Sequence, residues 1–448
     1  MMRVFSALLL LLALAGCAGI PGTGKGKEIA GYDRQVNVID TQYLHQMDRT
    51  MVGDPALASY VQGIRGKLEA AHGDPCDCVV LVDSFGGYEA YSISTKTAVV
   101  SAGVVAQVDS EDELAAIIAH ELGHVYSLDA VKGMFQDATI FAINAAGWAA
   151  GAGGYSIMLE DYVDDVSRGL IYRRWNVEQE MDADLFAMDL LVKAGYSVSG
   201  LKMAVRKLAQ YGAHASHPSS AAAVCAAGGR RFDDKRLKAC SKIWTGAQDS
   251  VYQDRDSRLK AILAASRRLT SEERRRVQGK APPRFASVDY LFRMNNLVAT
   301  DAARLRRGLA AVERMSMPPS LEGNVSVTNR LAMAHRLLGD EAKAQAYLAR
   351  SYFSPNRTVW TFAQYYRHLS GSRDPDLVRR TINQSHAEVG PNQALLPMEA
   401  YLAKRHRLPG IRLETTGRCL LSLVGDAKTL NLCGEFEKRA DAGGPAPW

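Results

Sequence analysis

The sequence is poor in the residue types that dominate fibrous and disordered proteins. Glycine and proline contribute only 38 and 15 of the 448 residues, which excludes a collagen-like or low-complexity chain. Charged residues make up 23% and the formal net charge is +6, which is too little charge to keep a chain unfolded. Hydrophobic residues, at 47%, are frequent enough for a buried core, and the length predicts two or three domains.

Long apolar runs are also scarce. The run from Val4 to Leu14 is too short to span a bilayer. The Ala- and Gly-rich segment 137–154 is short, is interrupted by glycines and contains Asn144. We therefore predict a buried helix there rather than a membrane span.

The N-terminus nevertheless predicts export. Arg3, the apolar run and two small residues before Cys17 have the order of a signal peptide over residues 1–16. The tetrad Leu14-Ala15-Gly16-Cys17 resembles the lipobox of bacterial lipoproteins, in which the cysteine is acylated. Ala18 stands where an aspartate would favour inner-membrane retention, so the resemblance implies the periplasmic side of the outer membrane. The alternative is a signal peptide that is cleaved without acylation, which also places the protein outside the cytoplasm.

Two further segments are interpreted in the light of export. Residues 17–30 are rich in glycine and lack periodicity, so we expect a flexible tether that carries the lipid. Nucleic acid is a poor partner for an exported protein. The arginines of residues 267–276 are therefore interpreted as a solvated helix face or a contact for anionic lipid headgroups.

The seven cysteines fit an oxidising compartment. With Cys17 acylated, six remain, and the sequence alone leaves their pairing open. The entropy of loop closure favours disulfides between cysteines that are close in the sequence. These would be Cys225 with Cys240 and Cys419 with Cys433, which leaves Cys76 and Cys78. A metal site at Cys76-Asp77-Cys78 is an alternative, but no second cysteine or histidine cluster supports it.

The segment before the central motif predicts one helix and two strands. Apolar residues recur at helical spacing from Asp54 to His72. Val79 to Val82 is typical of a strand, and Ala90 to Val105 contains a second strand with a turn near Thr95 to Thr97. Ser110 and Glu113 match a capping box, which predicts that a helix begins there. We expect its buried face to contain Leu114, Ile117, Ile118 and Val125.

The strongest signal is His120-Glu121-Leu122-Gly123-His124, on that helix. Residues four apart share one helical face, so both imidazoles can bind one zinc ion. Glu121 lies one position round the helix, close enough to take a proton from water activated by the metal. The alternative, a surface helix with scattered histidines, does not explain the capping box and the apolar stripe.

A third ligand is predicted from Glu180-Met181-Asp182-Ala183-Asp184. Glu180 and Asp184 lie one helical turn apart on one face, so Glu180 can bind the metal while Asp184 orients a ligand. The helix opens near Asn176 and Gln179 and runs to Gly195. Its expected buried stripe is Met181, Leu185, Met188 and Val192. The alternative is that these acidic residues only interact favourably with the dipole at the N-terminus of the helix.

These motifs resemble the HtpX and CAAX-prenyl endopeptidase family of gluzincins, especially its periplasmic BepA-like branch. The likeness covers about residues 40–225 and includes Glu113-Leu114-Ala115, the Glu180 to Asp184 element and Ala194-Gly195-Tyr196. It implies one Zn²⁺ per chain, bound by His120, His124 and Glu180, with Glu121 as general base. It also implies that His217 of His217-Pro218 lies near the metal, as a transition-state stabiliser or a latency ligand. The alternative for His217 is a surface loop histidine.

The resemblance has one departure and ends before the C-terminal half. Glu89-Ala90-Tyr91 stands where many relatives have Asn-Ala-Phe. From Val327 to His368 the sequence resembles one tetratricopeptide-type hairpin, with a turn at Gly339-Asp340 and close packing by Ala342 and Ala346. We expect an α+β fold: a mainly helical zincin-type domain with a small sheet over residues 31–227, a helical linker region 228–290 and a helical, tetratricopeptide-like domain 291–448.

The expected function is zinc-dependent cleavage of unfolded or misassembled cell-envelope proteins. Protein substrates are expected to lie extended along the strand near Ala90 to Ile93, and the C-terminal helices are candidates for docking on envelope assembly machinery. The alternative is a chaperone-like or scaffold lipoprotein whose zinc site is idle or latent. An intact Glu121 argues against an idle site. A zinc amidase is a third and weaker hypothesis, because the resemblance implies peptide substrates.

The lipid anchor gives a direct prediction. Cys17→Ser should release the protein from membranes while leaving its fold intact, because the Gly-rich tether separates the anchor from the folded part. Membrane fractionation and circular dichroism measure the two effects. Undiminished membrane association of the variant would refute the anchor.

Overall fold

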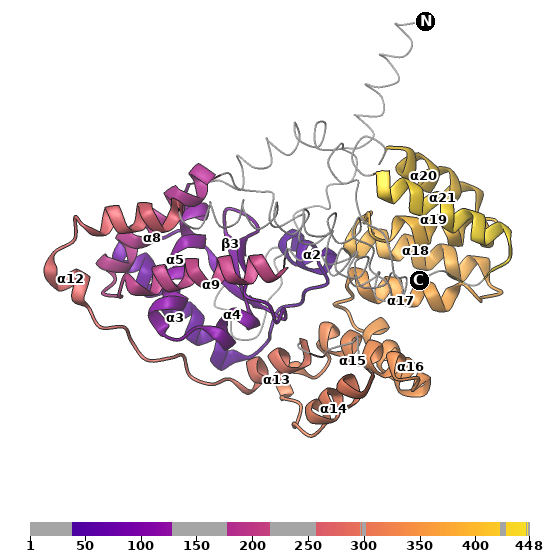
Figure 1. Ribbon diagram of the computed structural model, residues 1–448. Helices are drawn as coiled ribbons and strands as arrows, with labels where there is room; N and C mark the ends of the chain where they lie inside the picture. Colours follow the sequence, from indigo (N-terminus) through magenta and orange to yellow (C-terminus); the bar gives the residue numbers. More distant parts are fainter. Residues whose placement is uncertain are drawn as a thin grey trace, which may run out of the picture.

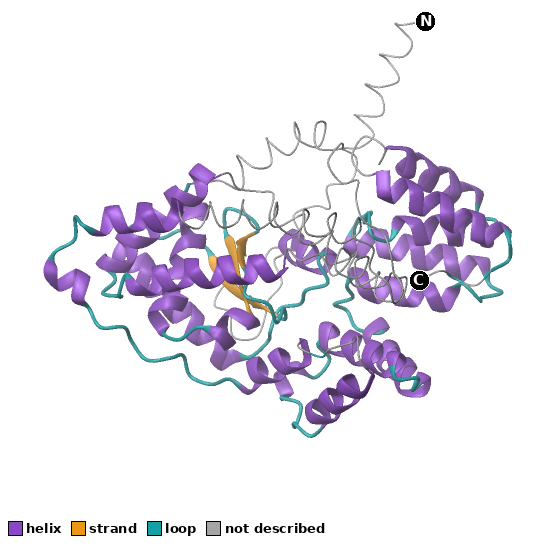
Figure 2. Ribbon diagram, viewed as in Figure 1, coloured by secondary structure: helices purple, strands orange, loops and turns teal. Residues whose placement is uncertain are grey.

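The computed structural model describes residues 38–127, 177–215, 257–295, 297, 302–421, 427–444 and 446. It shows helices around a small sheet in the N-terminal part and a helical C-terminal part (Figure 1, Figure 2), which is the predicted α+β architecture. Several predicted features lie outside the described residues: the signal peptide, Cys17, the tether, segment 137–154, His217 and the pair Cys225–Cys240.

In the described residues of the N-terminal part, helices and short strands alternate up to residue 107, and the later elements are helices. Its elements are α2 (Val38–Gln46), α3 (Pro55–His72), β1 (Val79–Asp83), β2 (Ala90–Ser92), β3 (Thr97–Ser101), α4 (Ala102–Gln107), α5 (Glu111–Tyr126), α8 (Val177–Lys193) and α9 (Ser199–Ala215).

Helix α3 forms where the apolar periodicity predicted it. The Asp54 carboxylate accepts hydrogen bonds from two backbone N–H groups of the first turn, and Pro55 stands where no N–H is needed. Gly73 ends the helix at a φ of 82°, which is open to glycine without strain. The buried face of α3 contacts β1, α5 and α8.

The three strands form one sheet in the order β1-β3-β2. β1 and β3 are parallel, with Val79 opposite Thr97, whereas β2 and β3 are antiparallel. Every residue of β1 and β3 is buried, so both faces of the sheet are covered. β2 is an edge strand within the described residues, and α5 packs beside it.

The segment Ala90 to Val105, for which the sequence predicts a strand with a turn, is helical from Ala102 onwards. Ser101 is the last residue of β3. Its hydroxyl accepts a hydrogen bond from the N–H of Val104, which caps α4. The β-branched residues after Ser101 are therefore helical because a local cap outweighs their strand propensity.

Helix α5 begins at the predicted N-cap, but the capping box is only half formed. Ser110 Oγ accepts the N–H of Glu113, while the Glu113 carboxylate accepts from Asp109 N and Tyr88 Oη instead of Ser110 N. Tertiary partners have replaced the local bond, because Glu113 is fully buried. All residues from Asp112 to Val125 are buried, a wider face than the predicted stripe.

The predicted buried stripe of α8 is partly wrong. Met188 is buried, whereas Met181, Leu185 and Val192 are only half-buried. The fully buried positions are Ala183, Asp184, Ala187, Leu190 and Leu191. Small residues and the carboxylate of Asp184, rather than the predicted apolar stripe, thus lie on the face of α8 that contacts α5.

Only helical elements occur among the described residues beyond 256. Residues 257–266 are helical. The remaining elements are α12 (Ser271–Arg275), α13 (Ala286–Asn295), α14 (Ala302–Glu313), η2 (Pro319–Leu321), α15 (Val325–Leu337), α16 (Glu341–Tyr352), α17 (Val359–Leu369), α18 (Pro375–Val389), α19 (Leu396–Arg405), α20 (Pro409–Leu421) and α21 (Ala427–Asp441).

Helices α15 and α16 form the predicted hairpin around Gly339, which has a φ of 79°. The predicted packing residues are wrong, however: Ala342 and Ala346 are exposed, and Ala344 and Leu348 face α15. Asp340 caps α16 through the N–H of Lys343, which sets the helix phase two residues away from the one assumed.

Side-chain contacts join the two halves of the chain. Hydrophobic residues of α13, α14 and α15 belong to the same cluster as those of α3, α5 and the sheet, while α17 to α21 share a second cluster. Buried polar groups also cross between the halves: Thr50 Oγ1 donates to Asn324 Oδ1 at 2.9 Å, and Thr358 Oγ1 donates to Asp48.

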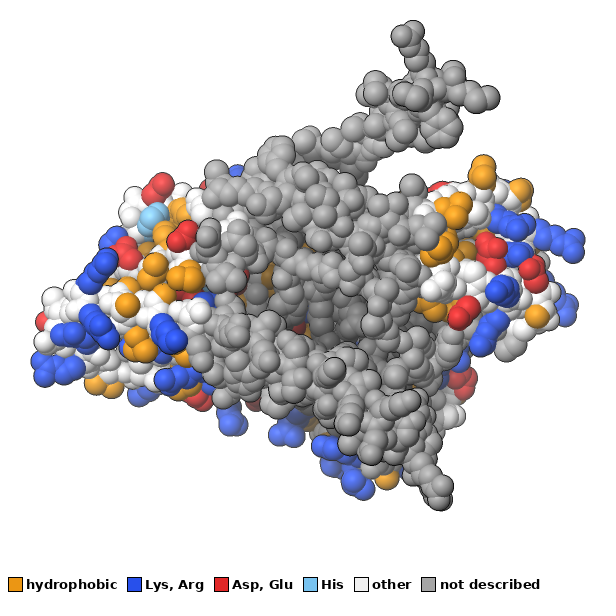
Figure 3. All heavy atoms as spheres, turned by 45° about the horizontal axis from the view of Figure 1, so that its top comes forward, with side chains coloured by type: hydrophobic (Ala, Val, Ile, Leu, Met, Phe, Trp, Pro, Cys, Tyr) orange, Lys and Arg blue, Asp and Glu red, His pale blue; other side chains and the backbone are white. Residues whose placement is uncertain are grey.

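Covalent and surface features agree in part with the sequence predictions. Cys419 and Cys433 form a disulfide between α20 and α21, and Cys76 and Cys78 are also joined. In the stretch 267–276, four of the five arginines are exposed, and Figure 3 shows basic side chains over the left end of the face. Among the described residues, no helix combines the length and hydropathy needed to cross a membrane.

The close contact of α9 with α5 gives a stability prediction. A methyl group at Gly200 would lie 2.4 Å from Asp112 O and 2.7 Å from Glu113 N, so Gly200→Ala must push the two helices apart and should lower the free energy of unfolding by about 1–3 kcal/mol. Gly63→Ala is the control: Gly63 is exposed in α3 with open space around it, and the change should stabilise by up to about 1 kcal/mol. Urea unfolding measures both, and destabilisation of equal size would contradict the packing.

Candidate metal centre

Close helix packing brings the two predicted motifs together. Gly123 of α5 lies so near α8 that a Cβ there would be 3.2 Å from Ala183 Cα and 3.2 Å from Phe186 Cδ1. Small residues at this crossing let the helix axes approach. The faces that carry His120 and His124 on α5 therefore meet the face that carries Glu180 and Asp184 on α8.

Three candidate ligands converge at this crossing. His120 Nε2 and His124 Nε2 lie 3.2 Å apart. The Glu180 carboxylate lies 3.4 Å from His120 Nε2 and 3.6 Å from His124 Nε2 through its two oxygens. Tetrahedral zinc with ligand bonds of about 2.0–2.1 Å separates its ligand atoms by about 3.3–3.4 Å. The spacing and the two-nitrogen, one-oxygen donor set therefore fit Zn²⁺.

Asp184 orients the first histidine. Its Oδ1 lies 2.9 Å from His120 Nδ1, and a carboxylate can only accept a hydrogen bond, so Nδ1 carries the proton. That tautomer leaves the Nε2 lone pair free to face Glu180 and His124. Asp184 is 1% exposed, so the contact is shielded from water.

Arg258 is a site residue that sequence reasoning missed. Its Nε and Nη2 donate to the two oxygens of Asp184 at 2.7 and 2.9 Å, and its Nη1 lies 2.9 Å from Glu180 Oε2. One guanidinium thus fixes both acidic groups in a fork geometry. The contact depends on packing of residues 257–266 against α8, and no local motif around Arg258 predicts it.

Glu121 lies beside the ligands and is also held in place. Ser92 Oγ of β2 lies 3.0 Å from Glu121 Oε2 and 3.0 Å from the Glu121 backbone oxygen. Glu121 is buried. The edge strand predicted to border the cleft therefore contacts the predicted general base.

The charges of the site support one another. Burial disfavours a charged imidazole, but the hydrogen bonds that His120 donates to Asp184 and Glu180 outweigh it and raise the pKa of His120 to about 10, so that a bound metal takes the place of the Nε2 proton. Burial opposes ionisation of Glu180 too, yet its contacts with His120 and His124 hold its pKa well below the usual range. Burial raises the pKa of Glu121, which makes it a better proton acceptor. A site that attracts protons this strongly also favours a divalent cation.

Among the described residues, one other group could hold a metal: Glu69, Cys76 and Cys78. Its two sulfurs are joined in a disulfide. Neither cysteine can then bind zinc, because a cysteine binds the metal only as a thiolate. The group of His120, His124 and Glu180 is therefore the better candidate.

Comparison with known proteins assigns a family to the segment that carries this donor set. Residues 57–227 match peptidase family M48. This chain contains a metalloprotease domain of family M48. The match contains α3, the sheet, α5 and α8, and it confirms the resemblance inferred from the sequence.

Individual M48 relatives cover different shares of the chain. The metalloprotease LoiP of Escherichia coli is 27% identical over 48% of this chain and 90% of its own length. A putative beta-barrel assembly-enhancing protease of Vibrio cholerae is 26% identical over 38% of this chain and 37% of its length. The metalloprotease YcaL of Escherichia coli is 33% identical over 20% of this chain and 36% of its length. This chain thus spans little more than a third of the latter two.

The ligand assignment predicts graded effects along α8. Glu180→Gln replaces a charged ligand by a neutral amide, so zinc affinity and peptidase activity should both fall sharply. Asp184→Asn weakens the orientation of His120 and should cost about 10–100-fold in metal affinity or activity. Asp182→Asn is the control, because Asp182 lies between the two on the exposed face and should have little effect.

Zinc titration with a competing chelator measures affinity independently of activity. Full zinc affinity in Glu180→Gln, or equal losses at Asp182 and Glu180, would refute the assignment.

Proposed function

We propose that this chain is a zinc-dependent endopeptidase that cleaves unfolded or misassembled proteins of the cell envelope. The observation that carries the proposal is the placement of the buried Glu121 carboxylate beside His120, His124 and Glu180, with Ser92 bonded to it. Such a set combines three metal ligands with a second carboxylate, that of Glu121, for proton transfer.

His120, His124 and Glu180 would hold one Zn²⁺. When bound, zinc supplies Lewis acidity, which makes water a stronger acid and polarises the scissile carbonyl. Glu121 then takes the proton from the attacking water and returns it to the leaving amine. Ser92 limits the Glu121 carboxylate to one orientation, and the pair Asp184 and Arg258 does the same for the ligand side.

The edge strand β2 supports an extended protein substrate. β2 is an edge strand of the described part of the sheet, so a peptide can extend the sheet beside it through backbone hydrogen bonds. Recognition through the backbone requires little sequence specificity and favours unfolded chains over folded ones. Because Ser92 of β2 contacts Glu121, a peptide bound there lies next to the general base.

The cell envelope is supported by the N-terminal export signal and lipobox, and by the name of the Vibrio cholerae relative. In this proposal Cys17 anchors the protein to the periplasmic side of the outer membrane, and the C-terminal helices α13 to α21 supply a surface for envelope assembly machinery. His217 remains a candidate for stabilising the transition state or blocking the site.

Glu121→Gln tests the chemistry. The amide cannot accept the proton, so cleavage of an unfolded protein should fall at least about 100-fold, while zinc content stays the same because Glu121 is not a ligand. Glu111→Gln is a matched control on the same helix, where Glu111 pairs with Tyr60 and Tyr196 instead. Casein cleavage and metal analysis measure the two effects.

Retained cleavage in Glu121→Gln would refute the proposed base. An inactive Glu121→Gln protein that restores a deletion strain as well as wild type would favour the scaffold alternative. Mass spectrometry of proteins trapped by Glu121→Gln identifies substrates.

A further inference from the structure

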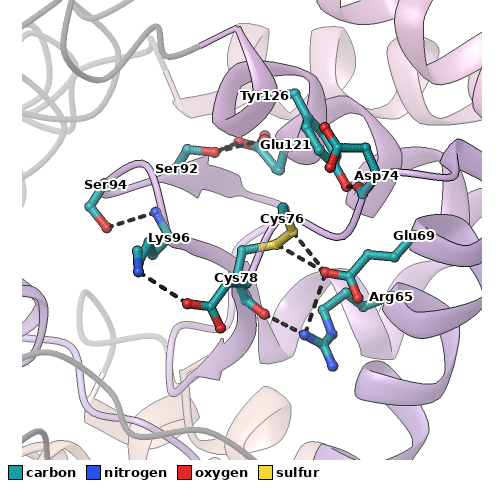
Figure 4. Close-up of a disulfide and its surroundings, with 11 residues drawn as sticks. Arg65, Glu69, Asp74, Cys76, Cys78, Ser92, Ser94, Lys96, Glu121 and Tyr126 are labelled. Atoms are coloured by element: carbon teal, nitrogen blue, oxygen red, sulfur yellow. Dashed lines mark hydrogen bonds and ion pairs between the residues drawn. A yellow bond between two sulfur atoms is a disulfide. The ribbon is translucent and has the colours of Figure 1, made fainter.

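A second reactive group lies at the start of the sheet, in the loop between α3 and β1. Figure 4 shows the sulfurs of Cys76 and Cys78 facing the carboxylate of Glu69, which comes from the last turns of α3. Glu69 Oε1 lies 2.8 Å from Cys76 Sγ and 3.6 Å from Cys78 Sγ. None of these three residues takes part in the metal centre.

The carboxyl group of Glu69 lies within reach of both sulfurs. A carboxylate accepts a hydrogen bond from a thiol, and a carboxylic acid can donate one to sulfur. Glu69 therefore stands where it can exchange a proton with the sulfur in either redox state.

Arg65 holds the carboxyl group of Glu69 beside the sulfurs. Its Nη1 lies 3.6 Å from Glu69 Oε1 and donates to the backbone oxygen of Cys78. One guanidinium therefore fixes both the proposed acid and base and the backbone of a cysteine that takes part in exchange.

The disulfide does little to hold the fold together. Cys76 and Cys78 are two positions apart, so the bond joins no two elements and restricts few unfolded conformations. Cys419 and Cys433, in contrast, are 14 positions apart and connect α20 to α21. Stability thus accounts for the second disulfide but leaves the first without a structural purpose.

We propose that Cys76 and Cys78 form a redox-active site that exchanges electrons with a dithiol of a second molecule, with Glu69 as its acid and base. Cys76 is half-buried and Cys78 is 1% exposed, so the incoming thiolate attacks Cys76 Sγ. A sulfur–sulfur bond to Cys76 forms, the Cys76–Cys78 bond breaks, and Cys78 leaves as a thiolate that receives, through Glu69, the proton of the incoming thiol. The second thiol of the partner then displaces Cys76, which leaves as a thiolate and takes the proton of that second thiol. The partner is oxidised to a disulfide by two electrons, and this pair is reduced to two thiols.

The test uses the full chain in glutathione buffers of increasing reducing strength, with alkylation and peptide mass spectrometry at each cysteine. The Cys76–Cys78 pair should become reduced under conditions in which Cys419–Cys433 stays oxidised. The second disulfide serves as an internal control, because general unfolding would expose both.

Substitutions then test the roles. With dithiothreitol as the probe, Glu69→Gln should slow reduction of the Cys76–Cys78 pair about 10-fold or more, and Asp77→Asn, in the same loop, should not. Cys78→Ser should form a glutathione adduct at Cys76, whereas buried Cys78 in Cys76→Ser should stay unmodified.

Three results would overturn the proposal. They are reduction of both disulfides together, a Glu69→Gln rate equal to wild type, and thiols protected by a metal that Cys76→Ser releases. The last result would make the group a metal site. None of these readouts depends on peptidase activity, so the proposed function stands or falls separately.

Discussion

The carboxylate of Asp184 is the point on which the metal centre depends. A buried carboxylate is costly unless its oxygens are paired, and Asp184 satisfies this requirement with His120 on one side and Arg258 on the other. The same contacts set the tautomer of His120 and tie residues 257–266 to α8. The energy of burying one charge is therefore offset by contacts that also define the ligand geometry.

The helix that carries the histidines is held at both of its ends. At its N-terminus, Lys280 O of the extended segment 276–285 accepts a hydrogen bond from Glu111 N–H, and Gly279 N–H of the same segment donates one to the Asp112 carboxylate. Near its C-terminus, Tyr126 Oη donates to Asp74 O, in the loop that leads to Cys76. Helix α5 is buried along nearly its whole length as a result, and a rigid helix keeps His120, Glu121 and His124 in fixed relation.

Local patterns predicted which side chains of each helix share a face, because the candidate site is concentrated in two helical motifs. A spacing of four residues places His120 with His124, and Glu180 with Asp184, whatever the rest of the fold. The apolar periodicity likewise predicted α3, and the cap at Ser110 predicted the start of α5. What these features share is that neighbours in the chain determine them.

Features that depend on tertiary packing were not predictable in this way. Arg258 reaches Asp184 from a helix 74 residues away, and Glu113 gives up its local capping bond for partners on other elements.

Zinc-edge X-ray absorption on the purified, zinc-loaded protein tests the ligand assignment, because it reports the ligand atoms themselves. We expect two imidazole nitrogens at about 2.0–2.1 Å, carboxylate oxygen and no sulfur. A sulfur shell at about 2.3 Å would place the metal at Cys76 and Cys78 and contradict the assignment of His120, His124 and Glu180.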